Sequence, residues 1–273
     1  MKLRNITMIL LTLSGLLFAG AWLFGCSSAP PVVPITLEEQ LKQDNAIGRQ
    51  LAKDFENQIS LVKDIDLEVY LRKIAQGLTE ATPALKEAPI GILVIRDVNK
   101  KWQNFALPGN RVYLSIGMLK KAEFENEIAA AIAFELAHVL KRHAVLKLEK
   151  SAEDRTSEAE VARTKLPENP DEQPVLNVRY FGPAGIFNFS NIATISSIDE
   201  TVGVLYRAGW DARGLIGIFE KFRNTPDQSP YSNELLLKLI DEARFSISQY
   251  PPLRNPFVKS TAFIGMKQRI NSL

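Results

Sequence analysis

The most distinctive hydrophobic pattern of the chain spans residues 124–143, FENEIAAAIAFELAHVLKRH. Within it, residues 128–140 are all apolar except Glu135 and His138, and the segment contains no Gly or Pro. An Ala-, Leu- and Ile-rich run of this length is typical of a helix that is hydrophobic on all sides and therefore buried. A carboxylate and an imidazole inside such a helix are costly unless they find partners.

This helix is expected to begin near Lys121, to run through His143, and to continue into a charged, solvated extension, 145–164. The following stretch, 166–174, holds three prolines and indicates an exposed connection. Residues 180–190 are rich in Gly and Phe and show no clear period. We therefore interpret 145–190 as a charged helix followed by an irregular insertion.

Apolar residues at helical spacing predict several further helices. Thr36 and Glu39 form a capping-box pattern at the start of the first helix, and Asp211 is placed to cap another. The segments concerned are 36–55, 66–78, 195–209, 211–222 and 233–248.

Two stretches have the pattern of strands. Residues 90–95, IGILVI, form a short apolar run between turn residues, which indicates a buried strand. Residues 105–115 contain two extended segments around Pro108-Gly109-Asn110, which predicts a hairpin. Apolar and polar residues alternate after this turn, so one face of the second strand is expected to be buried. We predict an α+β fold of helices around a small sheet, in one domain from 36 to 273.

The first residues have the organisation of a targeting segment. Lys2 and Arg4 precede an apolar run, 6–24, which is followed by Gly25 and the only cysteine, Cys26. This order resembles a bacterial lipoprotein signal, with 1–25 removed and Cys26 lipidated. The Pro-rich stretch 26–35 is then an extended tether.

The lipoprotein resemblance predicts attachment to the membrane through the lipid on Cys26, with the domain in the cell envelope and facing the periplasm. Ser27, rather than Asp, follows the cysteine, which favours the outer membrane if the host has one. The alternative is an inner-membrane anchor, because the 19 apolar residues Ile6–Phe24 suffice to span a bilayer.

Charge excludes one class of partner. The chain has 33 Lys and Arg and 31 Asp and Glu, a net charge of +2. No cluster of basic residues interleaved with aromatic residues is present, so nucleic acid is not an expected partner.

Several separate motifs resemble one family, and they follow the same order along the chain. They are Asn45-Ala-Ile-Gly-Arg-Gln-Leu51, Asn104-Phe-Ala-Leu-Pro-Gly109, Arg111-Val-Tyr-Leu114, Glu135-Leu-Ala-His138 and Tyr206-Arg-Ala-Gly-Trp-Asp211. The chain resembles the zinc metallopeptidases that include the CAAX prenyl endopeptidase, the mitochondrial Oma-type proteases and bacterial periplasmic relatives. The resemblance covers roughly residues 36 to 273 and implies a zincin-like fold with the hairpin beside the metal-binding helix.

The same resemblance implies that the metal site is degenerate. Zincins bind zinc through an HExxH helix, in which two histidines are ligands and the glutamate is the general base. Here Glu135 corresponds to the base and His138 to the second ligand, but Phe134 replaces the first histidine. Counting back from the AGWD segment places Ser196 where the family has a ligand glutamate. Tyr250 stands where the family has a later histidine before a proline.

The surviving residues also have purely structural interpretations. Phe134 is core packing, and Glu135 is expected to pair with His138, three residues on along the same helix face. On a continuous helix His143 lies about 140° around from His138 and does not replace the lost ligand.

The hairpin suggests how a polypeptide would bind. In zincins an edge strand beside the cleft can pair with an extended substrate. Residues Arg111, Val112, Tyr113 and Leu114 are the candidate cleft strand, and such pairing needs no metal.

Three functions remain open. The first is a catalytically inactive, lipid-anchored peptidase-like protein, without a cofactor, that binds unfolded polypeptides or envelope partners. The second is an active metalloendopeptidase in envelope protein quality control, which would hold zinc with a divergent ligand set. The third is a structural docking protein in which the old cleft is closed.

Overall fold

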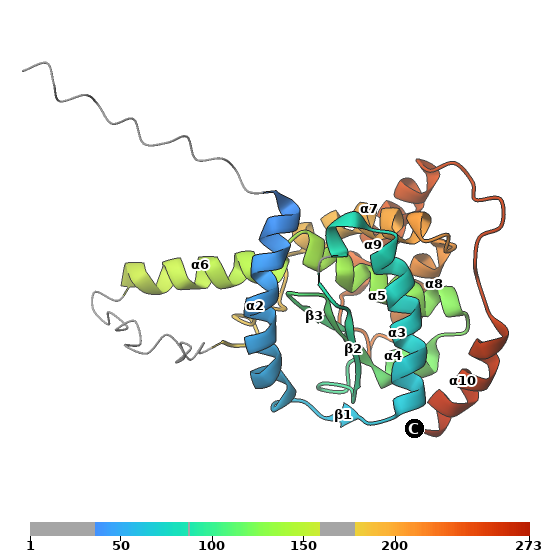
Figure 1. Cartoon of the computed structure of the whole chain (residues 1–273), viewed down its shortest axis with the longest axis horizontal. Helices are drawn as coiled ribbons and strands as arrows, with labels where there is room; N and C mark the ends of the chain where they lie inside the picture. The colour runs from blue at the N-terminus through green and yellow to red at the C-terminus, as the bar shows by residue number, and fades with distance from the viewer. Residues whose placement is uncertain (1–35, 87, 159–177) are drawn as a thin grey trace, which may run out of the picture. The chain divides into compact units, whose positions relative to one another are not determined.

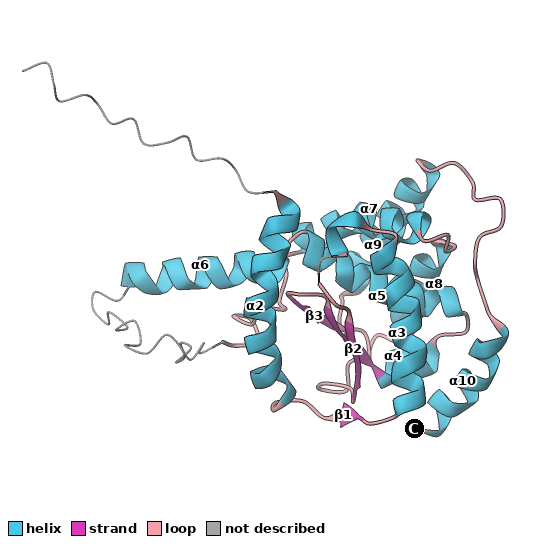
Figure 2. Cartoon of the chain, in the orientation of Figure 1, coloured by secondary structure: helices cyan, strands magenta, loops and turns pink. Residues whose placement is uncertain are grey.

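A four-stranded mixed sheet forms the centre of the fold, with helices around it (Figure 1). The structure, a computed structural model, describes residues 36–86, 88–158 and 178–273. The predicted signal peptide 1–25, the tether 26–35 with Cys26, and part of the predicted insertion lie outside these residues. Most of the described chain is helical (Figure 2), which confirms the predicted α+β fold.

The helices follow the periodicity of the sequence closely, apart from the charged junction after residue 140. Thr36 caps the first helix with the predicted capping box, its hydroxyl accepting from Glu39 N. The C-terminal helix, 261–272, was not predicted. The helices are α2 (Leu37–Glu56), α3 (Ile65–Glu80), the 3-10 helix η1 (Pro83–Leu85), α4 (Ile116–Lys121), α5 (Glu125–Leu140), α6 (His143–Glu158), α7 (Asn191–Arg207), α8 (Arg213–Arg223), α9 (Asn233–Ser248) and α10 (Thr261–Ser272).

The sheet has the strand order β1-β2-β4-β3, in which β4 is internal. The strands are β1 (Leu61–Val62), β2 (Gly91–Ile95), β3 (Phe105–Leu107) and β4 (Arg111–Ser115). β3 and β4 form the predicted hairpin, and β4 also pairs in parallel with β2 over its whole length. The prediction that Arg111, Val112, Tyr113 and Leu114 offer an edge to a substrate strand is therefore wrong. The outer strand on this side of the sheet is β3.

The predicted one-sided burial of β4 is also wrong, because apolar layers cover both faces of the sheet. Tyr113, expected on the exposed face, is fully buried. Its ring packs 4.9 Å from that of Phe55 on α2, and its hydroxyl donates to Glu56 at 2.8 Å. Tyr180 and Phe187, from the segment before α7, belong to the same apolar cluster. An alternating pattern cannot show that a second layer, built from distant segments, closes over the polar-looking face.

The hairpin turn is fixed against α2 and η1. A Cβ atom on Gly48 of α2 would lie 1.7 Å from the carbonyl oxygen of Pro108, so only glycine allows this approach. Asn110 adopts a left-handed φ of 58°. Its side-chain amide donates to the carbonyls of Leu85 and Ala88 at 2.8 and 2.9 Å. These contacts set the position of β3 and β4 relative to the helices.

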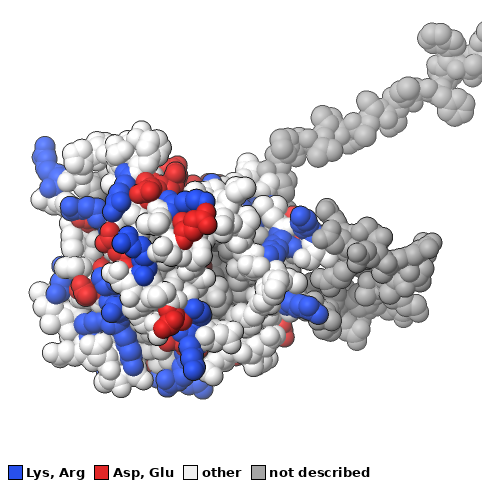
Figure 3. All heavy atoms as spheres, turned by 180° about the vertical axis from the view of Figure 1, so that it is seen from behind, with Lys and Arg blue, Asp and Glu red and all other residues white. Residues whose placement is uncertain are grey.

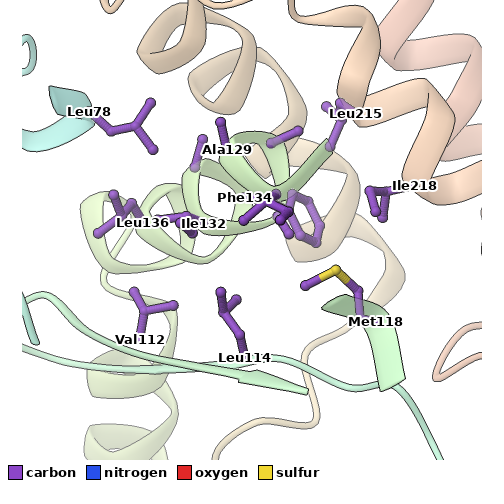
Figure 4. Close-up of a cluster of buried hydrophobic side chains, with 14 of the residues drawn as sticks. Leu78, Val112, Leu114, Met118, Ala129, Ile132, Phe134, Leu136, Leu215 and Ile218 are labelled. Carbon is purple, nitrogen blue, oxygen red and sulfur yellow. The ribbon is translucent and has the colours of Figure 1, made fainter. Parts of the chain in front are cut away.

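Helix α5 is the core element that the sequence predicted, since each of its residues is buried. It lies between the sheet on one side and α7 and α8 on the other. Figure 4 shows its apolar side chains facing Val112 and Leu114 of β4 on one side and Leu215 and Ile218 of α8 on another. Each large apolar side chain buried in this way contributes about 1.5–3 kcal/mol to stability.

Acidic and basic side chains are interspersed over the face of the molecule drawn in Figure 3, in keeping with a net charge near zero. In the part of the chain that the structure describes, no helix is both long and apolar enough to span a membrane.

Candidate functional site

The predicted long helix around His138 starts a few residues later than expected and is interrupted after Leu140. Helix α4 ends at Lys121, α5 occupies 125–140, and α6 begins at His143. Arg142, between α5 and α6, has a φ of 54°, in the left-handed region that costs a non-glycine residue roughly 1–2 kcal/mol. The expectation of one continuous helix through His143 is therefore wrong.

An ion pair with α2 holds this break in place. Arg142 donates to the carboxylate of Asp44 through Nε at 2.7 Å and Nη2 at 2.9 Å. The Asp44 side chain is only 3% exposed, so the pair is well shielded from solvent. Bidentate Arg–carboxylate pairs of this kind are strong and directional. The pair offsets the unfavourable backbone conformation of Arg142.

The break brings the chain's two histidines together. His138 Nδ1 and His143 Nδ1 lie 2.9 Å apart, so one ring donates a hydrogen bond to the other. Burial, reinforced by His143, lowers the pKa of His138 to about 3. Burial, reinforced by Lys141, lowers the pKa of His143 to about 4. Both rings are therefore neutral at pH 7, and the expectation that His143 points away from His138 is wrong.

Aromatic rings enclose the histidine pair. Phe189 stacks on His138 with centroids 4.5 Å apart and an interplanar angle of 17°. Phe134 meets the same imidazole edge-on at 5.0 Å and packs against Phe219 of α8 at 5.5 Å. Phe134 is 4% exposed and belongs to the main apolar core, as predicted (Figure 4).

Glu135 is buried without a partner. It is 5% exposed, and no hydrogen bond or ion pair reaches its carboxyl group from any described residue. Burial alone raises its pKa to about 8, so the carboxyl is mostly protonated at pH 7. The predicted pairing of Glu135 with His138 does not occur, because the near partner of His138 is His143.

Glu135 and His138 line a cavity of about 230 Å³. Its wall is formed by the loop before β3, the segment before α7, the start of α7 and the start of α9. The lining residues are Gln103, Asn104, Phe105, Glu135, His138, Phe187, Asn188, Phe189, Asn191, Thr194, Pro230, Tyr231, Ser232 and Leu235. Burial and the nearby Glu135 raise the pKa of the Tyr231 phenol.

Ser196 does not face this cavity. It is exposed, and its hydroxyl donates to the carbonyl of Ala193 at 2.8 Å. The α7 residues on the cavity wall are Asn191 and Thr194, and Thr194 lies about 200° around the helix from Ser196. The prediction that Ser196 occupies the lost ligand position beside His138 is wrong, because counting from a distant motif does not fix the rotation of α7.

Tyr250 is also remote from the histidine pair. Its ring packs 4.8 Å from that of Tyr206, and both line a separate cavity of about 280 Å³ with Trp210. It therefore provides no group to the site around Glu135.

These positions decide whether a catalytic zinc fits. Such a zinc needs about three protein ligands and an open position for water. No three His, Cys, Asp or Glu side chains come together to bind a metal within the described ranges. Phe134 stands at the position of the first ligand and packs against His138, so this helix offers one histidine where an HExxH helix offers two. The described residues do not fit a catalytic zinc centre.

Several residues beside Glu135 and His138 were not predicted from the sequence. His143 was dismissed because the helix was assumed to be continuous, and no residue pattern at 141–142 marks the break. Phe189 and Tyr231 lie in segments without periodicity. The density of Phe in 180–190 was the one available sign that this segment covers an apolar or aromatic site.

A buried helix with an ExxH motif beside a hairpin, enclosed by helices, defines the class of zincin-like metallopeptidase domains. Residues 69–168 match the sequence profile of Peptidase family M48. Over these residues the chain is similar to this zinc metallopeptidase family, in keeping with its motifs.

A relative in Vibrio cholerae serotype O1 is named "Putative beta-barrel assembly-enhancing protease". It is 26% identical over 233 residues, which cover 81% of this chain and 46% of the relative. The chain thus spans about half the length of this curated relative.

Proposed function

We propose that the chain is a cell-envelope protein that binds polypeptides in the cavity beside Glu135 and does not cleave them. The observation that carries this proposal is the donor set at the former metal position. A general base without a metal-bound water has nothing to activate, and the group next to Glu135 in sequence is the phenyl ring of Phe134.

The cavity supports binding rather than a closed, purely structural role. It has a volume of about 230 Å³ and contains both polar and aromatic side chains, as ligand pockets usually do. Phe105, in its wall, belongs to β3, the outer strand of the sheet. An extended segment pairing with β3 would therefore pass the opening of the cavity.

Anchoring and location form part of the same proposal. A lipid on Cys26 would attach the domain to a membrane on its periplasmic side, and the tether 26–35 would separate the two. The Vibrio cholerae relative, named for β-barrel assembly, supports a role among envelope proteins. The inner-membrane anchor Ile6–Phe24 is the alternative arrangement.

The second candidate is an active metalloendopeptidase of envelope quality control, and the word protease in the relative's name favours it. It requires a zinc ligand set other than the side chains around His138, and it predicts cleavage that depends on Glu135.

Incubating the purified full-length chain with a panel of unfolded proteins separates the two candidates. The proposal expects stable complexes with intact polypeptides, and no fragments by mass spectrometry with or without added zinc. Glu135→Gln should leave the absence of fragments unchanged. Cleavage that a chelator and Glu135→Gln both abolish would establish the peptidase, and a lack of any complex would refute polypeptide binding.

A further inference from the structure

The walls of the cavity combine one acid with several aromatic rings. Among the residues that the structure describes, Glu135 is the only acidic one in the lining, and no Lys or Arg lines the cavity. Rings from three Phe residues and one Tyr surround the same space: Phe105, Phe187, Phe189 and Tyr231. The other ionisable group in the wall, His138, is already hydrogen-bonded to His143, with 2.9 Å between the two Nδ1 atoms.

The carboxyl group of Glu135 has no hydrogen-bond or ion-pair partner among the described residues. A buried carboxylate normally has a cation or hydrogen-bond donors as partners, because an unpaired one costs several kcal/mol. Glu135 is nevertheless 5% exposed and receives no hydrogen bond from the described part of the chain. Its place in the cavity wall leaves the partner to come from a ligand.

The remaining polar groups favour a cation with several N–H donors. Asn104, Asn191 and Thr194 line the cavity and carry oxygen acceptors. Aromatic faces attract an ammonium group by about 0.5–2 kcal/mol each, most when it is desolvated. An anion, in contrast, would meet Glu135 and no cationic side chain in the cavity lining.

Two basic side chains near the cavity, Lys147 and Arg142, do not pair with Glu135 because each has another partner. Lys147, on α6, donates to the carbonyl of Asn188 and is absent from the cavity lining. Arg142 is committed to Asp44. Neither of these two cations, and no Lys or Arg of the described cavity lining, is placed opposite Glu135.

We propose that the cavity binds the ammonium group of the bound polypeptide, carried by a lysine side chain or by the chain's N-terminus. This inference rests on the proposed polypeptide binding and names the group that is recognised. Four methylenes and an ammonium occupy roughly 150 Å³ at about 30 Å³ per water-sized group. The cavity of about 230 Å³ accommodates them.

A set of fluorescent peptides tests the proposal on the full-length protein. The peptides are extended, N-acetylated and identical except at one central position, which carries Lys, norleucine or Gln. Fluorescence anisotropy should show the Lys peptide binding at least about tenfold more tightly than the other two. A further peptide, with a free N-terminus and no Lys, reports binding through the terminal ammonium.

Protein variants assign the effect to Glu135. Glu135→Gln keeps the size of the side chain and should abolish the preference for Lys over norleucine. Glu220→Gln is the matched control, since Glu220 on α8 forms a surface pair with Arg244 and does not line the cavity. It should retain the preference. If a variant fails to fold, the comparison of the Lys, norleucine and Gln peptides on the unaltered protein still tests the proposal.

Each outcome separates this inference from the proposed function. Equal binding of the Lys, norleucine and Gln peptides would overturn ammonium recognition while polypeptide binding stands. Failure of all peptides to bind would overturn both. A Lys preference that survives Glu135→Gln would also refute the assignment to this cavity.

Discussion

Glu135, His138 and His143 show how differently three polar side chains of one site are partnered. The two imidazoles bond to each other at 2.9 Å, and Phe189 covers them. Glu135 stays buried and alone in the cavity wall. The site therefore combines a satisfied histidine pair with an unsatisfied acid, and only the acid is free to act on a ligand.

The isolation of Glu135 predicts a specific dependence of stability on pH. Its pKa is about 8 in the folded chain and near 4.5 when unfolded, so the folded chain binds more protons between these values. The free energy of unfolding should fall as pH rises through this window, by up to about 1.4 kcal/mol per pH unit. The histidines act in the opposite direction but only below about 6.5, because their pKa values are lowered from 6.5.

Urea unfolding of the unaltered protein and of Glu135→Gln between about pH 6.5 and 8 isolates this effect. The variant should lack the decline, so the difference between the two stabilities should grow as pH rises. Parallel profiles would show that the Glu135 carboxyl is well solvated or paired in the folded protein.

The sequence alone located Glu135, His138 and Phe134 correctly on a buried helix, because an unbroken apolar run fixes burial. It could not place His143 or Thr194. The first depends on one left-handed residue, Arg142, that is held by an ion pair to a helix about 100 positions away. The position of Thr194 depends on how α7 is rotated about its axis relative to α5, and the packing of the two helices determines this rotation.

At the scale of elements, the junction of α2 with the hairpin positions β3 beside the cavity. The close approach of Gly48 to the Pro108 carbonyl leaves no room for a side chain. Gly77, on helix α3, has free space instead, because a Cβ atom at this position would meet no atom within 4 Å.

These two glycines form a matched pair for mutation. Gly48→Ala should destabilise the protein by about 2 kcal/mol or more, because backbone must move to admit the methyl group. Gly77→Ala should be neutral or stabilising by about 0.5–1 kcal/mol, because alanine is the better helix former. Thermal unfolding of both variants measures the contrast, and equal effects would disprove the tight contact between α2 and the hairpin.

The helices and the hairpin were predictable because their periodicities are local. The internal position of β4 was not, since strand order depends on which distant segments pair. The apolar layer that buries Tyr113 on the second face of the sheet was not predictable either, because it is built from α2 and residues 180–187, which are distant in sequence.

At the scale of the whole molecule, an α+β fold that resembles a zincin-like metallopeptidase domain occurs with described residues that provide no cluster for a metal. The match to the family profile covers 69–168, the part that contains β2 to α5 and, of the cavity lining, residues 103–105, Glu135 and His138. We interpret the molecule as a peptidase scaffold reused to hold polypeptides.

The metal content of the purified full-length chain tests this interpretation most directly. Elemental analysis after equilibration with zinc and removal of the unbound metal should find far less than one zinc per chain. Phe134→His alone should not change this, because it would supply at most a second histidine ligand and Thr194, on the cavity wall, offers no carboxylate as the third. One tightly held zinc per unaltered chain, lost on His138→Ala, would contradict the account.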